Sequence, residues 1–238
     1  MAAHAARSDL TLVIETSNPG AGSAGEVGLA HDDEVTASLE LAPSARHDDA
    51  LMPAIAALCD DRGVAASAIG RVVVSVGPGG YSSVRIAVAT AKMISFATGA
   101  ACVPAPSDAS AACGAGVSGT VAVAMASKSR DGGSAWVRAF EMDPHGARAL
   151  GPGVVADEAG LAALHERSGF ASLVADAHLP DAMRAWAKGA GVTVAPMALT
   201  AASCLAASGG IAPVPALELE CVYPRDPEAV RKWRELKR

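Results

Sequence analysis

Aromatic residues are scarce in this chain, which has three Trp, two Tyr and three Phe among its 238 residues. Because 51% of the residues are nevertheless hydrophobic, the interior has to be filled by Val, Leu, Ile and a large amount of Ala. Such small side chains allow helices to pack closely. The length fits one large domain or two small ones, since domains usually hold roughly 100 to 200 residues.

The chain also lacks paired cysteines and an excess of positive charge. Its five cysteines are widely scattered, with no CxxC pair and no spacing suited to zinc, which is typical of reduced thiols in a cytoplasm. The formal net charge of -6 argues against broad capture of nucleic acid by this chain alone. No apolar run is long enough to cross a bilayer, and the first residues lack the apolar core of a signal peptide. We therefore expect a soluble cytoplasmic protein.

What the chain does have is a strand, a glycine-rich turn and a helix between Arg71 and Gly99. The run 72–76 is apolar and mostly β-branched, which predicts a strand buried on both faces. The run 83–98 carries good helix formers and closes on a glycine. The turn between them, GPGGYSS, presents backbone N–H groups at a helix N-terminus and suits an anion. It matches neither GxxxxGK[ST] nor GxGxxG, and the other interpretation is that its glycines bring the helix close to the sheet.

The rest of the first half predicts an antiparallel meander followed by helices and a further strand. Expected strands cover 10–14, 26–30, 34–41 and 101–106, and expected helices cover 45–62 and 107–113. His47 lies near the start of the first helix. A metal site there would want a second ligand one turn later, but position 51 is Leu, so we expect no metal site.

A glycine-rich stretch at 114–119 predicts the boundary between two subdomains, residues 1–115 and 116–238. The second half predicts strands at 120–126, 135–142, 171–175 and 192–194, and helices at 157–168, 180–190 and 200–208. Three strands precede the first helix, whereas a doubly wound nucleotide-binding fold would alternate strand and helix from the outset. The order therefore predicts an α/β protein with mixed sheets.

Four segments resemble the bacterial TsaB proteins, also called YeaZ, of the actin-like and sugar-kinase-like ATPase-domain superfamily. The first is the strand ending in Glu15-Thr16-Ser17, which is similar to Asp-Thr-Ser in the family, and the second is Arg46-His47 followed by Leu51-Met52-Pro53. The third is the run from Gly77 to Ile86, which is close to the family's GPGSFTGVRIG. The fourth is Tyr223-Pro224-Arg225, which is like the family's closing Tyr-x-Arg. The chain is identified as a divergent member. Glu15 replaces the usual Asp, the loop after Ser17 is longer, and Ser127-Lys128-Ser129-Arg130 stands near the place of the usual Asp-Ala-Arg.

The resemblance implies two actin-like (RNase H-like) subdomains with mixed β-sheets flanked by helices. It implies a non-catalytic scaffold or activating subunit that pairs with TsaD to make N6-threonylcarbamoyladenosine at position 37 of tRNAs that read ANN codons. A TsaE-like ATPase is a further implied partner, tRNA is contacted only through the complex, and the chain forms a homodimer when alone. No cofactor is required of this chain, and ATP or ADP, where used, binds at the partner or at the subunit interface.

Two sets of candidate residues follow from the motifs and the resemblance. The candidate phosphate contacts are Thr16, Ser17, Gly77, Gly79 and Gly80. The expected interface uses the helices at 45–62 and 83–98, since one face of each covers the sheet and the other can pair with a second chain. Its candidate residues are His47, Leu51, Ile55, Tyr81, Val84, Arg85, Val88, Ala91 and Ser95. We expect Arg at position 88 or 91 to abolish pairing with TsaD and to leave the chain folded.

An ATP-dependent phosphotransferase of the sugar-kinase-like class is the alternative function. It would use Thr16-Ser17 and the Gly77 turn to hold phosphates, and it would also need a carboxylate base and a magnesium ligand. Titration with ATP and magnesium separates the two hypotheses, because micromolar binding with turnover would contradict a scaffold role.

Overall fold

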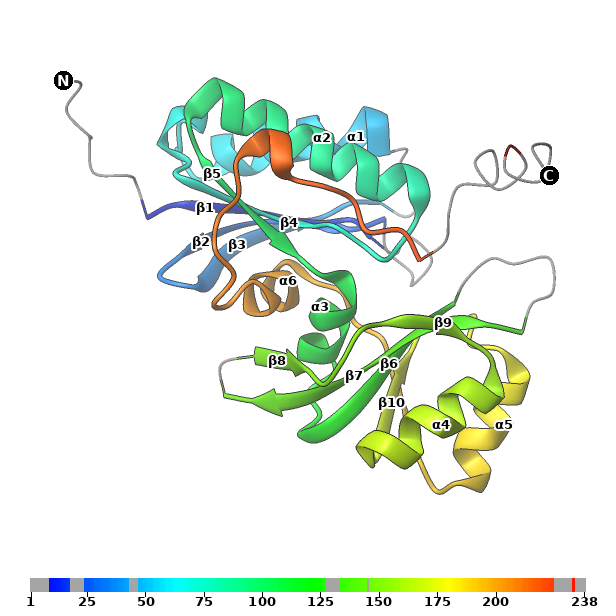
Figure 1. Ribbon diagram of the computed structural model, residues 1–238. Coiled ribbons are helices and arrows are strands. Elements are labelled where there is room, and N and C mark those ends of the chain that lie inside the picture. Colours follow the sequence, from blue (N-terminus) through cyan, green and yellow to red (C-terminus); the bar gives the residue numbers. More distant parts are fainter. Residues whose placement is uncertain are drawn as a thin grey trace.

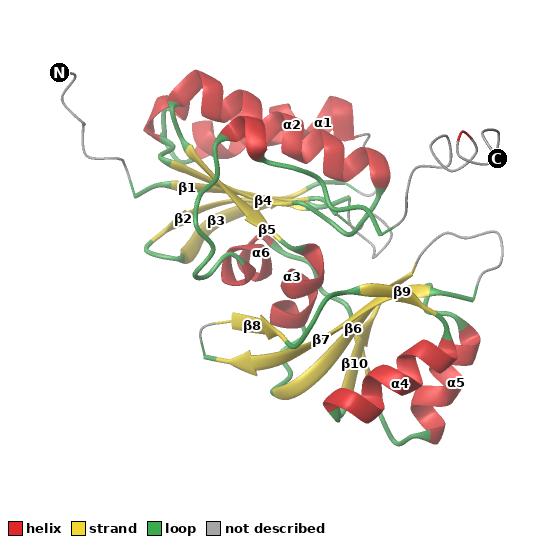
Figure 2. Ribbon diagram, viewed as in Figure 1, coloured by secondary structure: helices red, strands yellow, loops and turns green. Residues whose placement is uncertain are grey.

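The computed structural model describes residues 9–17, 24–42, 47–126, 133–144, 146–224 and 233. The described strands form two mixed β-sheets, and helices cover both faces of each (Figures 1 and 2). The layers run from a pair of helices through the first sheet, a middle layer of two short helices and the second sheet to a second pair of helices. This is the predicted α/β class with mixed sheets.

The first sheet has the strand order β3-β2-β1-β4-β5. Strands β1, β2 and β3 pair antiparallel, which confirms the predicted meander, and β4 and β5 add to β1 in parallel. The bounds are Thr11–Glu15 for β1, Glu26–His31 for β2, Glu34–Glu40 for β3, Arg71–Ser75 for β4 and Ala101–Ala105 for β5.

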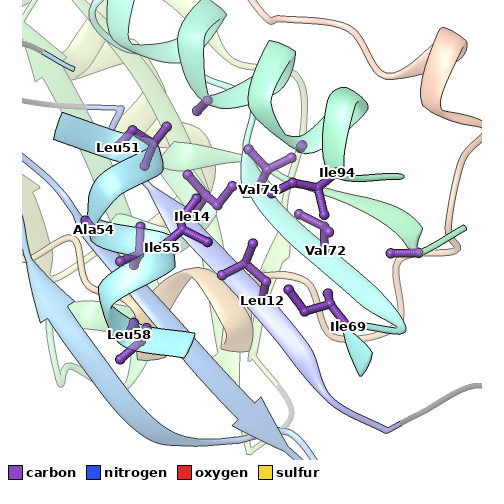
Figure 3. Packing of buried hydrophobic residues seen from close by; sticks show 14 of the residues in the cluster. Leu12, Ile14, Leu51, Ala54, Ile55, Leu58, Ile69, Val72, Val74 and Ile94 are labelled. Atoms are coloured by element: carbon purple, nitrogen blue, oxygen red, sulfur yellow. The ribbon is translucent and has the colours of Figure 1, made fainter. Parts of the chain in front are cut away.

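Two helices, α1 (His47–Asp61) and α2 (Tyr81–Thr98), cover one face of this sheet. Side chains alternate along a strand, so Leu12 and Ile14 of β1 and their counterparts on β4 point toward these helices and form a cluster with them (Figure 3). The intervening Val13 packs on the opposite face. The prediction of a strand buried on both faces is therefore confirmed for β4, whose neighbour β1 shares this pattern.

The middle layer holds two helices made almost wholly of small residues, α3 (Ser107–Gly114) and α6 (Ala201–Ala207). Helix α6 packs on the inner face of the first sheet, where Cys204 and Leu205 join the cluster around Val13. Helix α3 packs on the inner face of the second sheet, and the two helices contact each other. Their small side chains let both fit between the sheets.

The second sheet has the order β11-β10-β6-β7-β8, and β9 pairs with β7. Helices α4 and α5 cover its outer face around Leu161, Phe170 and Met183, which are fully buried. The bounds are Gly119–Ala126 for β6, Ala135–Asp143 for β7, Gly146–Ala149 for β8, Val154–Ala156 for β9, Ser172–Ala175 for β10, Thr193–Pro196 for β11, Glu158–Ser168 for α4 and Asp181–Gly189 for α5.

The C-terminal part of the chain returns to the first sheet, which corrects the predicted second subdomain of residues 116–238. After α6, residues 211–224 form a segment that we call the C-terminal strap. Its Val214 bridges to Cys102 of β5, and its Leu219 is buried in the cluster beneath α2. The strap includes a short 3-10 turn, Ala216–Glu218, that lies along α2 (Figure 1). Local patterns predict the helix at 200–208 but cannot show which sheet it covers.

Candidate functional site

The glycine-rich turn joins β4 to α2 and meets the end of β1. The N–H of Gly77 donates to Ser107 Oγ at 3.1 Å, and the N–H of Ser107 donates back to the Gly77 carbonyl at 3.0 Å. The N–H of Gly80 donates to the Ser17 carbonyl at 2.6 Å. Two of the N–H groups that could have faced an anion are therefore used inside the protein.

Backbone segments approach this turn so closely that side chains would not fit. A Cβ on Gly79 would lie 2.1 Å from the Ser17 carbonyl oxygen, and a Cβ on Gly77 would lie 2.5 Å from that of Val222. Gly77 also has φ +99°, in the region that favours glycine. These two glycines thus let the end of β1 and the C-terminal strap pack against the start of α2.

The two hydroxyl residues after β1 also have internal partners. Thr16 donates through its N–H to Ser75 Oγ at 3.2 Å and through its hydroxyl to the Ser83 carbonyl at 3.3 Å. Both Thr16 and Ser17 are buried. The fold therefore brings together all five predicted phosphate contacts, Thr16, Ser17, Gly77, Gly79 and Gly80, but the polar groups described above are engaged by the protein itself. Phosphate contact at this turn stays a prediction.

Glu15 is a fully buried carboxyl group at the C-terminal end of β1. Its Oε1 accepts from the N–H and the hydroxyl of Ser17, at 2.7 and 2.6 Å, whereas its Oε2 has no hydrogen-bond partner among the described residues. Desolvation outweighs the bonds from Ser17 and raises the pKa of Glu15 to about 7. The carboxyl group therefore titrates near neutral pH.

Five of the predicted interface residues lie in the hydrophobic core, which corrects the face chosen for docking. Leu51 and Ile55 of α1 and Val84, Val88 and Ala91 of α2 are at most 5% exposed and belong to the cluster between these helices and the first sheet. The apolar stripe selected from the sequence is the one that covers the sheet. An Arg at position 88 or 91 would bury a charge, so it would not leave the chain folded.

The remaining predicted interface residues lie toward the surface or outside the described part. Tyr81 and Arg85 are exposed, and Ser95 is half-buried with its hydroxyl donating to the Ala100 carbonyl at 2.7 Å. Helix α1 begins at His47, but the side chain of this residue is outside the described part of the structure.

The opposite sides of α1 and α2 form an exposed and largely apolar surface, which we call the outward face. It centres on three large side chains, Met52 at 53%, Met93 at 66% and Phe96 at 60% exposure. Small exposed residues separate them: Pro53, Ala56, Ala57, Ala89 and Ala97. The two helices that carry these side chains lie next to each other on the same face of the first sheet. Neither Met93 nor Phe96 is among the interface residues predicted from the sequence.

An aromatic cluster links the N-terminus of α2 to the C-terminal strap. The rings of Tyr81 and Tyr223 have centroids 5.1 Å apart, and the Arg85 guanidinium lies 5.1 Å from the Tyr81 centroid while it donates to the Tyr81 hydroxyl at 2.6 Å. The N–H of Val222 donates to the Val76 carbonyl at 2.7 Å. The predicted Tyr-Pro-Arg motif is thus in contact with the glycine motif through Tyr223, whereas Arg225 lies outside the described residues.

Within the described ranges, no group of three or more His, Cys, Asp or Glu side chains is placed to hold a metal ion. None of the described helices has both the length and the apolar character needed to cross a membrane.

Comparisons with known proteins agree with this architecture. Residues 40–128 match the model of the TsaD family, tRNA N6-adenosine threonylcarbamoyltransferase. YeaZ from Pseudomonas aeruginosa has a similar structure, with a TM-score of 0.71 and 20% identity over 90% of this chain and 99% of that one. A structure described as an uncharacterized protein with similarity to peptidase YeaZ from Pseudomonas aeruginosa gives a TM-score of 0.70 and 20% identity over 91% and 100%. No curated protein matches the chain in sequence.

The fold therefore defines an α/β protein with two mixed sheets, arranged as in YeaZ. Within that class the chain is similar to TsaB, or YeaZ, over most of its length. Both the predicted fold class and the resemblance are confirmed.

Proposed function

We propose that this chain is a non-catalytic, cytoplasmic subunit that pairs with a TsaD-like catalytic subunit in the synthesis of N6-threonylcarbamoyladenosine at position 37 of ANN-decoding tRNAs. The observation that carries the proposal is that the chain is similar both to YeaZ in structure and to the TsaD family in sequence. About nine-tenths of the chain shares the YeaZ fold, and the segment with α1, β4, the glycine turn and α2 matches the TsaD family model. A chain related to both proteins fits a complex built from similar subunits.

The geometry of the glycine turn supports a structural role for this chain. The N–H groups of Gly77 and Gly80 and the hydroxyls of Thr16 and Ser17 are engaged by protein partners. A phosphotransferase would have to release several of these bonds to hold a nucleotide. The chemistry of the proposed complex therefore belongs to the TsaD-like subunit, and ATP or ADP is handled there, by a TsaE-like ATPase, or at the subunit interface.

The outward face supports pairing through α1 and α2. Large exposed apolar side chains that gather on neighbouring helices are typical of an interaction site. Met52, Met93 and Phe96 can act as anchors, while the alanines between them allow a partner helix to approach closely. A TsaD-like subunit occupies this face in the complex, and a second copy of the chain occupies it when the chain is alone.

The test of the function is depletion of the chain from its own cell, followed by mass spectrometry of nucleosides from bulk tRNA. We expect threonylcarbamoyladenosine to fall and to recover when the chain is restored. Unchanged levels would contradict the proposal. In a second experiment, calorimetric titration of the purified chain with ATP and magnesium should show no turnover, and turnover would favour the phosphotransferase instead.

A further inference from the structure

The buried carboxyl of Glu15 lies where the first sheet meets the middle helical layer. It follows Ile14 on β1, so it faces the same side as Val13, toward α6. Ser75 ends the adjacent parallel strand β4, whose Val74 is in register with Ile14. The Ser75 hydroxyl and the Cys204 thiol of α6 both lie beside the Glu15 carboxyl. Three elements therefore enclose this one acid.

Among the described residues, no positive charge is seen to compensate the Glu15 carboxyl. The described groups that interact with its carboxyl are Ser17, Ser75 and Cys204, and none of them is a cation. Burial and the neighbouring Glu15 raise the pKa of the Cys204 thiol well above its usual range, so this group stays protonated and neutral. An ionised Glu15 would thus be a lone buried charge with one oxygen, Oε2, without a hydrogen-bond partner among the described residues.

Helix α6 contacts the first sheet beside this acid through hydrogen bonds and through a buried apolar cluster. Its Cys204 Sγ lies 3.9 Å from the Ile14 carbonyl, and the N–H of Ala201 at its start donates to Glu26 Oε2 at 2.6 Å. The Cys204 thiol also lies beside the Glu15 carboxyl, and Ala201 and Leu205 pack in an apolar cluster with Val13 and Val73. Because α6 also packs on α3, it joins the first sheet to the helix that covers the inner face of the second sheet.

We propose that the proton on Glu15 is a conformational switch: the protonated acid keeps α6 closed on the first sheet, and its ionisation loosens α6 and the junction between the two sheets. This goes beyond the proposed function, since it needs no partner. The sign follows from the two protonation states. Glu15 binds its proton more tightly in the closed state, so the stability it provides is fully present below pH 4.5 and is lost as the pH rises through about 7.

The size of the effect follows from linkage. If Glu15 has its ordinary pKa of 4.5 when α6 is open and about 7 when it is closed, the open population rises about 30-fold between pH 5.5 and pH 8.5. Hydrogen exchange of the α6 amides, corrected for intrinsic rates, measures this population. We expect their protection to fall by about that factor in the wild type, while the amides of β6 in the second sheet change far less.

Two variants sharpen the test. Glu15→Gln keeps the shape of the protonated acid and removes the titration, so the protection of α6 should become independent of pH. Glu26→Gln alters the other carboxyl that contacts α6 and should keep the wild-type pH dependence. An equal fall in the protection of the α6 amides with pH in Glu15→Gln and in the wild type would overturn the proposal. An equal fall in the protection of the α6 and β6 amides of the wild type would also overturn the proposal, because it would indicate a general loss of stability. This comparison needs only the wild type, so it remains decisive if Glu15→Gln does not fold.

Discussion

Gly79→Ala is expected to destabilise the protein strongly, although Gly79 is exposed to solvent. The new Cβ would lie 2.1 Å from the Ser17 carbonyl oxygen, far inside contact distance. The same oxygen accepts the 2.6 Å hydrogen bond from the Gly80 N–H. Any shift that makes room for the methyl group therefore weakens the bond that ties the end of β1 to the start of α2.

The magnitude combines two contributions. Overpacking typically costs about 1–3 kcal/mol, and loss of a well-formed hydrogen bond costs about 1 kcal/mol more. We therefore expect the free energy of unfolding to fall by about 2–4 kcal/mol, a large part of the roughly 5–15 kcal/mol of a typical domain.

The assay is urea unfolding followed by circular dichroism, with Gly151→Ala as the matched control. A Cβ on Gly151 would meet no atom within 4 Å. Alanine there should leave stability unchanged or raise it by up to about 1 kcal/mol, because it restricts the unfolded chain. Equal unfolding midpoints for the two variants would refute the interpretation that Gly79 serves close backbone packing.

Three further predictions test the fold around the site. Val88→Arg should fail to give a cooperatively folded protein, because Val88 is 5% exposed on the side of α2 that packs on the first sheet; a cooperative melt near that of the wild type would contradict the core assignment. Leu12→Ala should lower the free energy of unfolding by about 2–5 kcal/mol, since Leu12 is fully buried (Figure 3), and a loss below 1 kcal/mol by urea unfolding would argue against it. Asp108→Ala removes the acceptor of the 2.9 Å hydrogen bond from Trp136 Nε1. The free energy of unfolding should fall by about 1–3 kcal/mol, and the tryptophan emission should shift. An unchanged spectrum and unchanged stability would show that this bond contributes nothing.

The strongest local patterns predicted their elements well. The β-branched run at 72–76 became β4, and the helix formers ending at Gly99 became α2, whose last turn closes on a left-handed glycine with φ 76°. Strands β8 and β9 were not predicted, because they are only four and three residues long and derive their pairing from β7. Short strands depend on their neighbours more than on their own sequence.

The outward face could not be chosen from the sequence of α2 alone. Both sides of this helix carry small and apolar residues, so Val84 and Val88 resemble an interface as much as Ala89 and Met93 do. What decides between them is the position of the sheet, which is a long-range property. The same holds for the C-terminal strap, since its contacts with β5, α2 and the glycine turn join residues more than a hundred positions apart.

The buried Glu15 illustrates a different limit. Its place after a strand and before two hydroxyl residues indicates a polar site. The sequence cannot show that desolvation is the largest influence on the pKa of this carboxyl group. The burial of Glu15 depends on α6, whose Cys204 lies against the end of β1 although it is far away in the sequence. A carboxyl group's chemistry is determined by elements that the local motif does not contain.

The measurement that tests the central claim most directly is the affinity of the folded chain for the TsaD-like subunit, determined by calorimetry for Phe96→Asp and for Leu150→Asp. Both residues are exposed, at 60% and 42%, but only Phe96 lies on the outward face of α2. Loss of a central apolar anchor should cost at least about 2 kcal/mol, so Phe96→Asp is expected to bind at least about 30-fold more weakly, while Leu150→Asp binds like the wild type. Wild-type affinity in folded Phe96→Asp would contradict the assignment of this face as the partner interface.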